Sequence, residues 1–270
     1  RGLLRLDVAD QPLAVLPAQG WGQLAGLRRL SFCNTRLREL PDEICELSSL
    51  EDLVLLQNAL RRLPTGVGVL PRLDQLRFTA NQVRALPEPL ALPKLTQLVA
   101  EGNELVAVPA DLFRRCPALV ELRLTGNAME RGPFVDDLDG PPSSSAPAGA
   151  GQERLAQQGP PVACAYLQGC RARALPAALC TPALRYLMFS ENLLTRLPAE
   201  LTQLENLRWL HLFGNRLATL PPGLLTGCRE LSHCLLEGNP LSAEATAALL
   251  GEARAAEALR PGRLRALGVD

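Results

Sequence analysis

Two consecutive stretches of this chain follow one pattern, LxxLxLxxNxLxxLP, and the copies begin at Leu184 and Leu207. Self-similarity at a period between about 20 and 29 residues indicates an array in which each unit contributes one short strand and a return segment. A single unit cannot bury its apolar face alone, so it relies on its neighbours to cover that face. The pattern therefore predicts a solenoid.

The spacing inside the unit decides which side chains face inward. Alternate residues of a strand point to the same side, so the last two leucines of LxxLxL share one face and the flanking x positions share the other. The asparagine stands where the chain leaves the strand, and its amide can bond main-chain groups that the turn leaves unpaired. Proline after leucine then fixes the return path. We expect the leucines in a core and the x residues on an outward face.

The pattern recurs in ten units, and most begin 22 to 24 residues after the one before. Seven of the ten asparagine positions hold Asn, and the other three hold Gln11, Thr35 and Cys170. The register is therefore secure, and we expect the solenoid to cover residues 1–241. The first position of the units is held by Leu3, Leu27, Leu50, Leu73, Leu95, Leu119, Val162, Leu184, Leu207 and Leu231.

One interval, from Leu119 to Val162, is 43 residues long. The surplus lies between about Pro133 and Gln152 of the sixth unit, and its centre reads DGPPSSSAPAGAG. That segment has no large apolar residue whose burial would offset the entropy lost on ordering. We expect a mobile loop on the return side, which is either a low-complexity expansion or a docking or modification segment.

The repeat pattern stops after Leu241. An alanine-rich stretch follows, for which we predict a helix from about Ala243 to Leu259 with Ser242 as N-cap and Pro261 with Gly262 as its stop. The last unit of a solenoid needs its open core covered. Residues 242–270 are therefore expected to form a capping helix and a tail.

Composition excludes several classes of function. The chain carries 28 basic and 28 acidic residues, interspersed in both halves, which argues against a nucleic-acid partner because such a partner needs a concentrated basic surface. It has no unbroken apolar run of about 18 residues, so no transmembrane helix and no membrane partner are expected.

The eight cysteines do not have the spacing of a disulfide framework. Cys170 takes an asparagine position, Cys234 takes a core leucine position, and Cys116 and Cys228 fall at matching places just before the next strand. Each behaves as a small buried apolar residue. This usage predicts a reduced protein of the cytoplasm.

All ten units resemble the leucine-rich repeat superfamily, over about residues 3 to 241. The unit length and the LPxxL element are similar to those of intracellular Ras-group-related plant proteins and their scaffold relatives in animals. The resemblance implies an α/β fold, namely a curved right-handed solenoid of about ten repeats with a parallel sheet on the concave face. It also implies that proteins bind on that sheet, without naming a partner.

Catalytic motifs are lacking: the sequence has no phosphate-binding glycine loop and no kinase or hydrolase signature. Its two histidines, His211 and His233, occupy outward positions on neighbouring strands, offset by two residues. Their Cβ atoms should then lie about 7 to 8 Å apart, which is loose for a shared metal even with Glu237 nearby. We predict no metal, no cofactor and no small-molecule substrate.

The outward face of the last four units differs from that of the first six. The x positions of the early units hold mostly small or charged residues, whereas those of the late units hold large apolar and aromatic ones, in a chain with only 4% aromatic residues. Aromatic residues gathered on a concave surface are typical of a binding hot spot. Alternatively, these side chains pack on each other, or another part of a longer protein covers them. The predicted partner-binding residues are Tyr166, Tyr186, Met188, Trp209, His211, Phe213, His233 and Leu235.

Three functions follow as hypotheses. The first is a non-enzymatic protein-recognition module or scaffold that binds a protein partner on the concave sheet. The second is the sensor or substrate-recruiting domain of a larger signalling enzyme, a kinase or GTPase, whose catalytic part lies outside these residues. The third, intrinsic enzymatic activity, is disfavoured because no nucleophile, base and orienting group can be assembled from the sequence.

Overall fold

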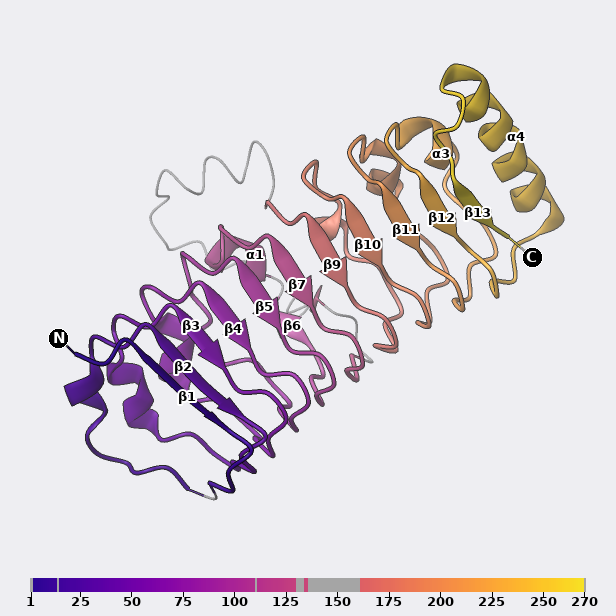
Figure 1. The fold of residues 1–270 in the computed structure, drawn as a ribbon. Helices are drawn as coiled ribbons and strands as arrows, with labels where there is room; N and C mark the ends of the chain where they lie inside the picture. The colour runs from indigo at the N-terminus through magenta and orange to yellow at the C-terminus, as the bar shows by residue number, and fades with distance from the viewer. Residues whose placement is uncertain (1, 14, 110, 130–133, 136–160, 270) are drawn as a thin grey trace, which may run out of the picture.

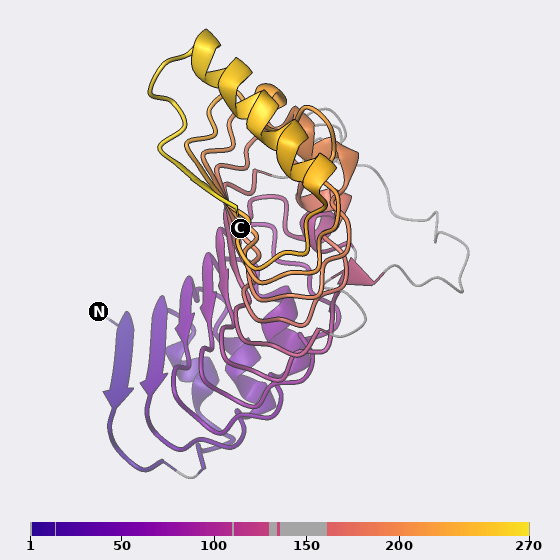
Figure 2. The ribbon, with the colours of Figure 1, turned by 90° about the vertical axis from the view of Figure 1, so that its right-hand side faces the viewer.

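A computed structural model describes residues 2–13, 15–109, 111–129, 134–135 and 161–269 of the chain. Within these residues the chain winds as a curved solenoid, with an 11-stranded parallel sheet along one side and short helices along the other (Figure 1). Viewed from its right-hand end, the strands line the inside of the curve (Figure 2). The sheet is therefore the concave face, as the resemblance to leucine-rich repeat proteins implies.

Each of the ten predicted units supplies one strand of the sheet, and neighbouring strands pair in register. In chain order the sheet contains β1 (Arg5–Ala9), β2 (Arg29–Cys33), β3 (Asp52–Val54), β4 (Gln75–Arg77), β5 (Gln97–Val99), β7 (Glu121–Arg123), β9 (Cys164–Tyr166), β10 (Tyr186–Met188), β11 (Trp209–His211), β12 (His233–Leu235) and β13 (Ala266–Gly268). Since equivalent positions of successive units are paired partners, such as Leu187 with Leu210, residues of one motif position form rows across the sheet.

Most of the described return segments on the convex side contain a single turn of helix. Proline directly precedes four of them, at Pro41, Pro64, Pro176 and Pro198, each in an extended conformation that turns the chain into the helix. The short helices are η1 (Trp21–Leu24), η2 (Asp42–Glu46), η3 (Thr65–Val69), α1 (Leu112–Arg115), η4 (Ala177–Leu179), η5 (Ala199–Gln203) and α3 (Leu224–Gly227).

The core lies between the sheet and the return segments. The leucines of the motif fill it, and Leu30, Leu53 and Leu210 are completely buried. Phe32 and Phe78 occupy the third leucine position in their units and are also buried, as the motif predicts. Burying each such side chain stabilises the fold by about 1.5–3 kcal/mol, so the row of leucines is the main source of stability.

Asparagines form a second row beside the core. The side chain of Asn192 accepts from the N–H groups of Cys170 and Ala172, at 3.0 and 2.9 Å, and donates to the carbonyls of Leu167 and Phe189 at 2.7 and 3.1 Å. One amide thus satisfies main-chain groups of two successive units. This explains why the motif places Asn where the chain leaves the strand.

Three units lack this asparagine, and in two of them, those with Thr35 and Cys170, the main chain replaces it in the same way. The N–H of Leu13 donates to the carbonyl of Thr35 at 2.8 Å, and the N–H of Met129 donates to the carbonyl of Cys170 at 2.9 Å. In each case the following residue has a left-handed backbone, with φ of 58° at Arg36 and 55° at Arg171. The Cys170 thiol also donates to the Leu124 carbonyl at 3.1 Å, as the asparagine amide does elsewhere. An extra left-handed residue therefore substitutes for the missing acceptor.

The predicted loop, about residues 133–152, lies outside the described residues except for its first part. There Phe134–Val135 forms β8, which pairs in parallel with β6 (Val108–Pro109) of the preceding unit. Residues 134–135 therefore pair with the return side of the preceding unit.

After the tenth unit comes helix α4 (Ala243–Leu259), with the bounds and the Ser242 N-cap that the sequence predicts: the Ala245 N–H donates to the Ser242 hydroxyl at 3.1 Å. The helix packs on α3, where the Glu252 carboxylate accepts from the N–H groups of Gly223 and Leu225 at 2.6 and 2.9 Å. These groups begin helix α3 and would otherwise lack acceptors.

The pattern does not end at Leu241, which corrects the sequence-based expectation of a simple tail. The chain returns from α4 to add β13, paired in register with β12. Leu264, Leu267 and Val269 supply an LxxLxV motif whose side chains pack against the core. Helix α4 thus takes the place of a return segment, and an eleventh strand covers the sheet edge that β12 would otherwise expose.

Candidate functional site

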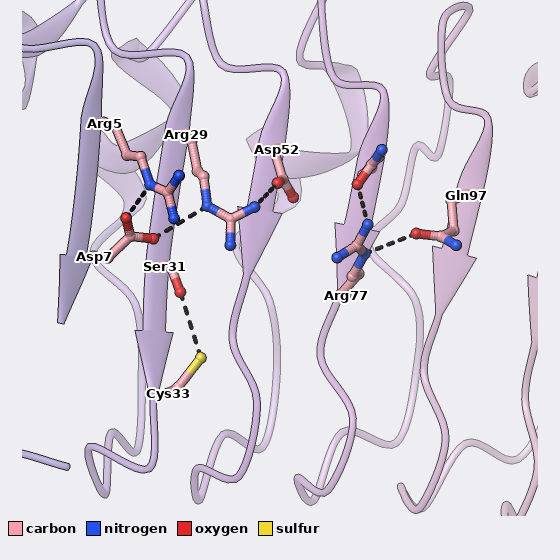
Figure 3. Close-up of polar contacts among 9 residues, drawn as sticks. Arg5, Asp7, Arg29, Ser31, Cys33, Asp52, Arg77 and Gln97 are labelled. Carbon is pink, nitrogen blue, oxygen red and sulfur yellow. Dashed lines mark hydrogen bonds and ion pairs between the residues drawn. The ribbon is translucent and has the colours of Figure 1, made fainter. Parts of the chain in front are cut away.

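Polar side chains on the N-terminal half of the concave face pair with one another across the strands. Arg29 on β2 lies between Asp7 and Asp52, with its Nε 3.1 Å from Asp7 Oδ1 and its Nη1 in contact with Asp52 (Figure 3). Arg77 on β4 contacts Gln75 of its own strand and Gln97 of β5, with its Nε 2.7 Å from Gln97 Oε1. This half of the surface therefore satisfies most of its own charges and hydrogen-bonding groups.

The concave face changes from paired polar side chains to aromatic ones between β7 and β9. Glu121 on β7 contacts Gln97 on one side and Arg123 on the other. The Arg123 guanidinium lies 4.6 Å from the centroid of the Tyr166 ring on β9, a cation–π contact. Arg123 thus links the row of ion pairs to the aromatic half of the face.

Trp209 on β11 is the centre of an aromatic cluster. Its ring centroid lies 5.9 Å from that of Tyr186 in an edge-to-face arrangement, 5.7 Å from His211 in a stacked one, and 4.7 Å from His233. In-register pairing brings these side chains together, because Tyr186, Trp209 and His233 occupy the same position of three successive units. The sequence-based alternative, that these residues pack on each other, is therefore part of the arrangement.

Packing nevertheless leaves two aromatic side chains open to solvent. Trp209 is 38% exposed and Phe213, which follows β11, is 37% exposed. Tyr166, Tyr186, His211, His233 and Leu235 are partly buried. The structure thus collects the predicted residues on one surface, with Trp209 and Phe213 as its most accessible members.

Met188 is the least exposed of the predicted residues. It lies on the concave face, but only 6% of it is exposed, because its paired neighbours Tyr166 and His211 stand on either side. Met188 therefore supports the aromatic side chains and does not present a contact surface.

The two histidines differ in their surroundings. Burial lowers the pKa of His211, the nearby His233 lowers it further, and the Glu237 carboxylate acts in the opposite direction. His233 Nδ1 lies 2.9 Å from the Ser232 hydroxyl. Among the described residues no group of three His, Cys, Asp or Glu side chains is arranged to hold a metal ion.

Beside the cluster, the ends of β5 to β11 enclose an open groove of about 640 Å³. Phe213 and Tyr166 form its apolar wall, and Glu101, Arg123 and Glu191 contribute charge. Sequence reasoning included the two aromatic residues of this groove and missed the charged ones. They stand at outward positions of the same motif, so a comparison of those positions for charge as well as aromatic character would have found them.

Backbone conformation singles out Glu191 in this groove. The residue before the asparagine position is left-handed in every unit, and most units of this half place glycine there, as at Gly169, Gly214 and Gly238. Glu191 adopts the same conformation, with φ 55°, although a side chain disfavours it.

Comparison with known proteins supports one superfamily. The sequence profile described as "Leucine rich repeat" matches residues 166–217 and 182–241. No curated protein sequence matches the chain significantly. In the described part of the chain no helix has the length and apolar character needed to span a bilayer.

Several solved structures share the fold. A leucine-rich repeat protein of Leptospira interrogans is 25% identical with a TM-score of 0.56, and the match covers 99% of this chain and 72% of that one. The leucine-rich repeat domain of the type III effector XopL is 25% identical with a TM-score of 0.66, covering 88% and 76%. YopM from Yersinia enterocolitica is 27% identical with a TM-score of 0.53, covering 88% and 48%.

Proposed function

We propose that this chain, which belongs to the leucine-rich repeat superfamily, is a non-catalytic recognition module that binds a protein partner on the C-terminal half of its concave sheet. Solenoids of stacked repeats present extended concave surfaces, and proteins of this architecture use them for binding. The proposal assigns no catalytic role to the chain and rests on a surface made mainly of aromatic and histidine side chains.

One observation carries the proposal: the exposure of Trp209 and Phe213 at the centre of a partly buried aromatic cluster. Large aromatic side chains ringed by less exposed neighbours are the arrangement in which a few residues supply most of the binding energy. Four neighbouring strands, β9 to β12, form a surface about 14 Å wide at a strand spacing of about 4.8 Å. That width accommodates one helix or loop of a partner.

The test is affinity capture from cells that express the protein, with the wild type and the Trp209→Ala, Phe213→Ala double variant as baits. We expect the variant to lose the partners that the wild type recovers, because truncating a central aromatic residue costs about 2 kcal/mol of binding, or about thirtyfold. A Val106→Ala, Leu259→Ala variant is the matched control, since these side chains are 54% and 78% exposed and lie away from the cluster.

Folding has to be measured beside binding. All four substitutions remove side chains outside the leucine core, so the variants should keep the fold. Trp209→Ala also removes contacts with three rings and should lower thermal stability modestly. If the double variant folds normally and still recovers the same proteins in the same amounts, the concave C-terminal surface is not the binding site.

We also propose that the protein works in a reducing compartment, the cytoplasm. All eight cysteines are free, and burial raises the pKa of Cys116 to about 11 and that of Cys180, Cys228 and Cys234 to about 12. Such thiols serve as apolar packing and are poor nucleophiles. Thiol titration of denatured protein, isolated without reductant, should find about eight free thiols. Four or fewer would indicate disulfides and an oxidising compartment.

A further inference from the structure

Two rows of charge border the aromatic cluster. On one side, exposed arginines stand just before the strands, at Arg185, Arg208 and Arg265 of the units that supply β10, β11 and β13. On the other side, carboxylates stand just after the strands, at Glu191 beyond β10 and Glu237 beyond β12. The concave face of this half therefore has a basic edge, an aromatic floor and an acidic edge, in that order along the strands.

These charges differ from their counterparts in the N-terminal half. Arg28 occupies the motif position of Arg185 and Arg208, and its guanidinium lies 3.6 Å from Glu51. By contrast, Arg185, Arg208 and Arg265 form no ion pair with any residue that the structure describes, and neither do Glu191 and Glu237. The charges bordering the cluster are thus left for a partner to neutralise.

Glu191 contributes a carboxylate to the acidic edge at a motif position where its neighbours have no side chain. It keeps a side chain at a left-handed position where Gly169 and Gly214 in the adjacent units have none. Asp10, Asn34, Gln57 and Ala80 of the first four units adopt this conformation as well, so it belongs to the motif. What distinguishes Glu191 is the carboxylate that it places there, in the half of the sheet where the other units have glycine. The Glu191 carboxylate lies at the groove beside Phe213, on the acidic edge of the surface.

We propose that the partner binds through a helix of about three turns that carries carboxylates at its N-terminal end, apolar side chains at its centre and lysine or arginine at its C-terminal end. This inference rests on the proposed function and specifies the partner for the same surface. The acidic end lies on the arginine row, the apolar centre on Trp209 and Phe213, and the basic end at Glu191 and Glu237.

The dimensions favour a helix lying along the strands. Phe213 occupies the motif position of Glu237, so the five positions from Arg208 to Phe213 measure the distance from the basic edge to the acidic edge, about 17 Å at about 3.3 Å per residue. A helix of about eleven residues has that length, and its diameter of about 10 Å fits a floor about 14 Å wide. A helix with acids first and bases last also complements its own dipole, which sets its direction parallel to the strands.

The experiment uses random 14-residue peptides displayed on phage, selected on the immobilised full chain after depletion on the Trp209→Ala, Phe213→Ala variant. We expect selected peptides to carry acidic and basic residues on opposite sides of an apolar centre. Synthetic versions are then titrated against wild type, Arg185→Glu with Arg208→Glu, and Glu191→Lys with Glu237→Lys. Each reversal should weaken binding by on the order of tenfold.

The decisive measurement reverses the charge of the peptide and of the protein together. Replacing the acidic end of a selected peptide with lysines should restore its binding to the Arg185→Glu, Arg208→Glu variant and weaken its binding to wild type. The control is Arg61→Glu with Arg62→Glu, two exposed arginines after β3 and away from the cluster, which should bind the original peptides as wild type does.

The possible failures separate the two proposals. Peptides that need Trp209 and Phe213 but lack opposite charges at their ends, or that bind the charge-reversed variants as tightly as wild type, overturn this inference and leave the proposed function standing. A selection that yields no peptide dependent on Trp209 and Phe213 overturns both.

Discussion

Arg29 and Trp209 occupy the same position of their respective units, but Arg29 is paired within the protein whereas Trp209 is open to a partner. Arg29 is held between two carboxylates from the neighbouring strands, so its charge is satisfied within the protein. Trp209 contacts three rings and still keeps 38% of its surface open. The comparison shows that the repeat fixes where an outward side chain stands, while its neighbours in the row decide whether it is available for binding.

The largest expected effect is a difference in the free energy of unfolding between a core variant and a variant of the aromatic cluster. Leu212→Ala should lower the free energy of unfolding by about 2–5 kcal/mol, because Leu212 is completely buried and its truncation leaves a cavity. Trp209→Ala should change it far less, since much of that side chain faces solvent. Urea denaturation of both variants measures the difference, and similar losses would show that Trp209 is a structural residue of the solenoid.

An intermediate effect is expected when the stability losses of arginine variants from the two halves are compared. Arg29→Ala should lower the free energy of unfolding by about 1 kcal/mol, because it leaves Asp7 and Asp52 facing each other without the intervening cation. Arg208→Ala removes a charge that has no partner among the described residues and should change stability by less than about 0.5 kcal/mol.

Salt sharpens this test. The loss for Arg29→Ala should shrink in 0.5 M NaCl relative to low salt, since screening weakens partly exposed pairs. Equal losses for the two arginine variants would remove the distinction between a self-paired half and an open half.

The smallest effect concerns the histidine of the aromatic floor. Burial holds the pKa of His211 below its ordinary 6.5, so the unfolded chain takes up a proton at this residue more readily than the folded one. Above about pH 6.5 His211 is neutral in both states and does not reduce the free energy of unfolding. As the pH falls below that value towards the folded pKa, the unfolded state binds the proton first and the free energy of unfolding decreases. His211→Gln should reduce this acid-dependent loss in denaturation experiments between pH 8 and pH 5. A midpoint for His211 above 6.5 in an NMR titration would contradict the assignment.

The fold was predictable because its determinants repeat. Leucine spacing fixes the inward face, and the asparagine fixes where each strand ends, so the ten strands and helix α4 fall where the motif and the Ser242 cap place them. Strand β13 was missed since helix α4 lengthens its interval: Leu264 follows Leu231 by 33 residues, well beyond the regular period. The motif itself was visible at Leu264, Leu267 and Val269.

The candidate site was predictable only in part. The spacing of the motif determines which side chains point outward, and it places Trp209, Phe213 and their neighbours on one face. The spacing does not determine how exposed each side chain is, because exposure depends on the side chains of adjacent strands: Met188 has an outward position and is covered. The groove at Glu101 and Glu191 depends on the three-dimensional arrangement of several units, which the spacing within one unit does not describe.

The hydrogen bond from the Met129 N–H to the Cys170 carbonyl has a consequence for engineering the array. At most other junctions a unit is joined to the next through an asparagine side chain, whereas this contact passes from main chain to main chain. The Cys170 thiol adds a bond to the Leu124 carbonyl, but the acceptor for the Met129 N–H comes from the main chain, so this joint does not require an asparagine and should accept exchange of whole blocks on either side. We expect residues 2–129 to be transplantable in front of a different array whose first unit has a left-handed residue at the place of Arg171, and a single cooperative unfolding transition of such a chimera would demonstrate it.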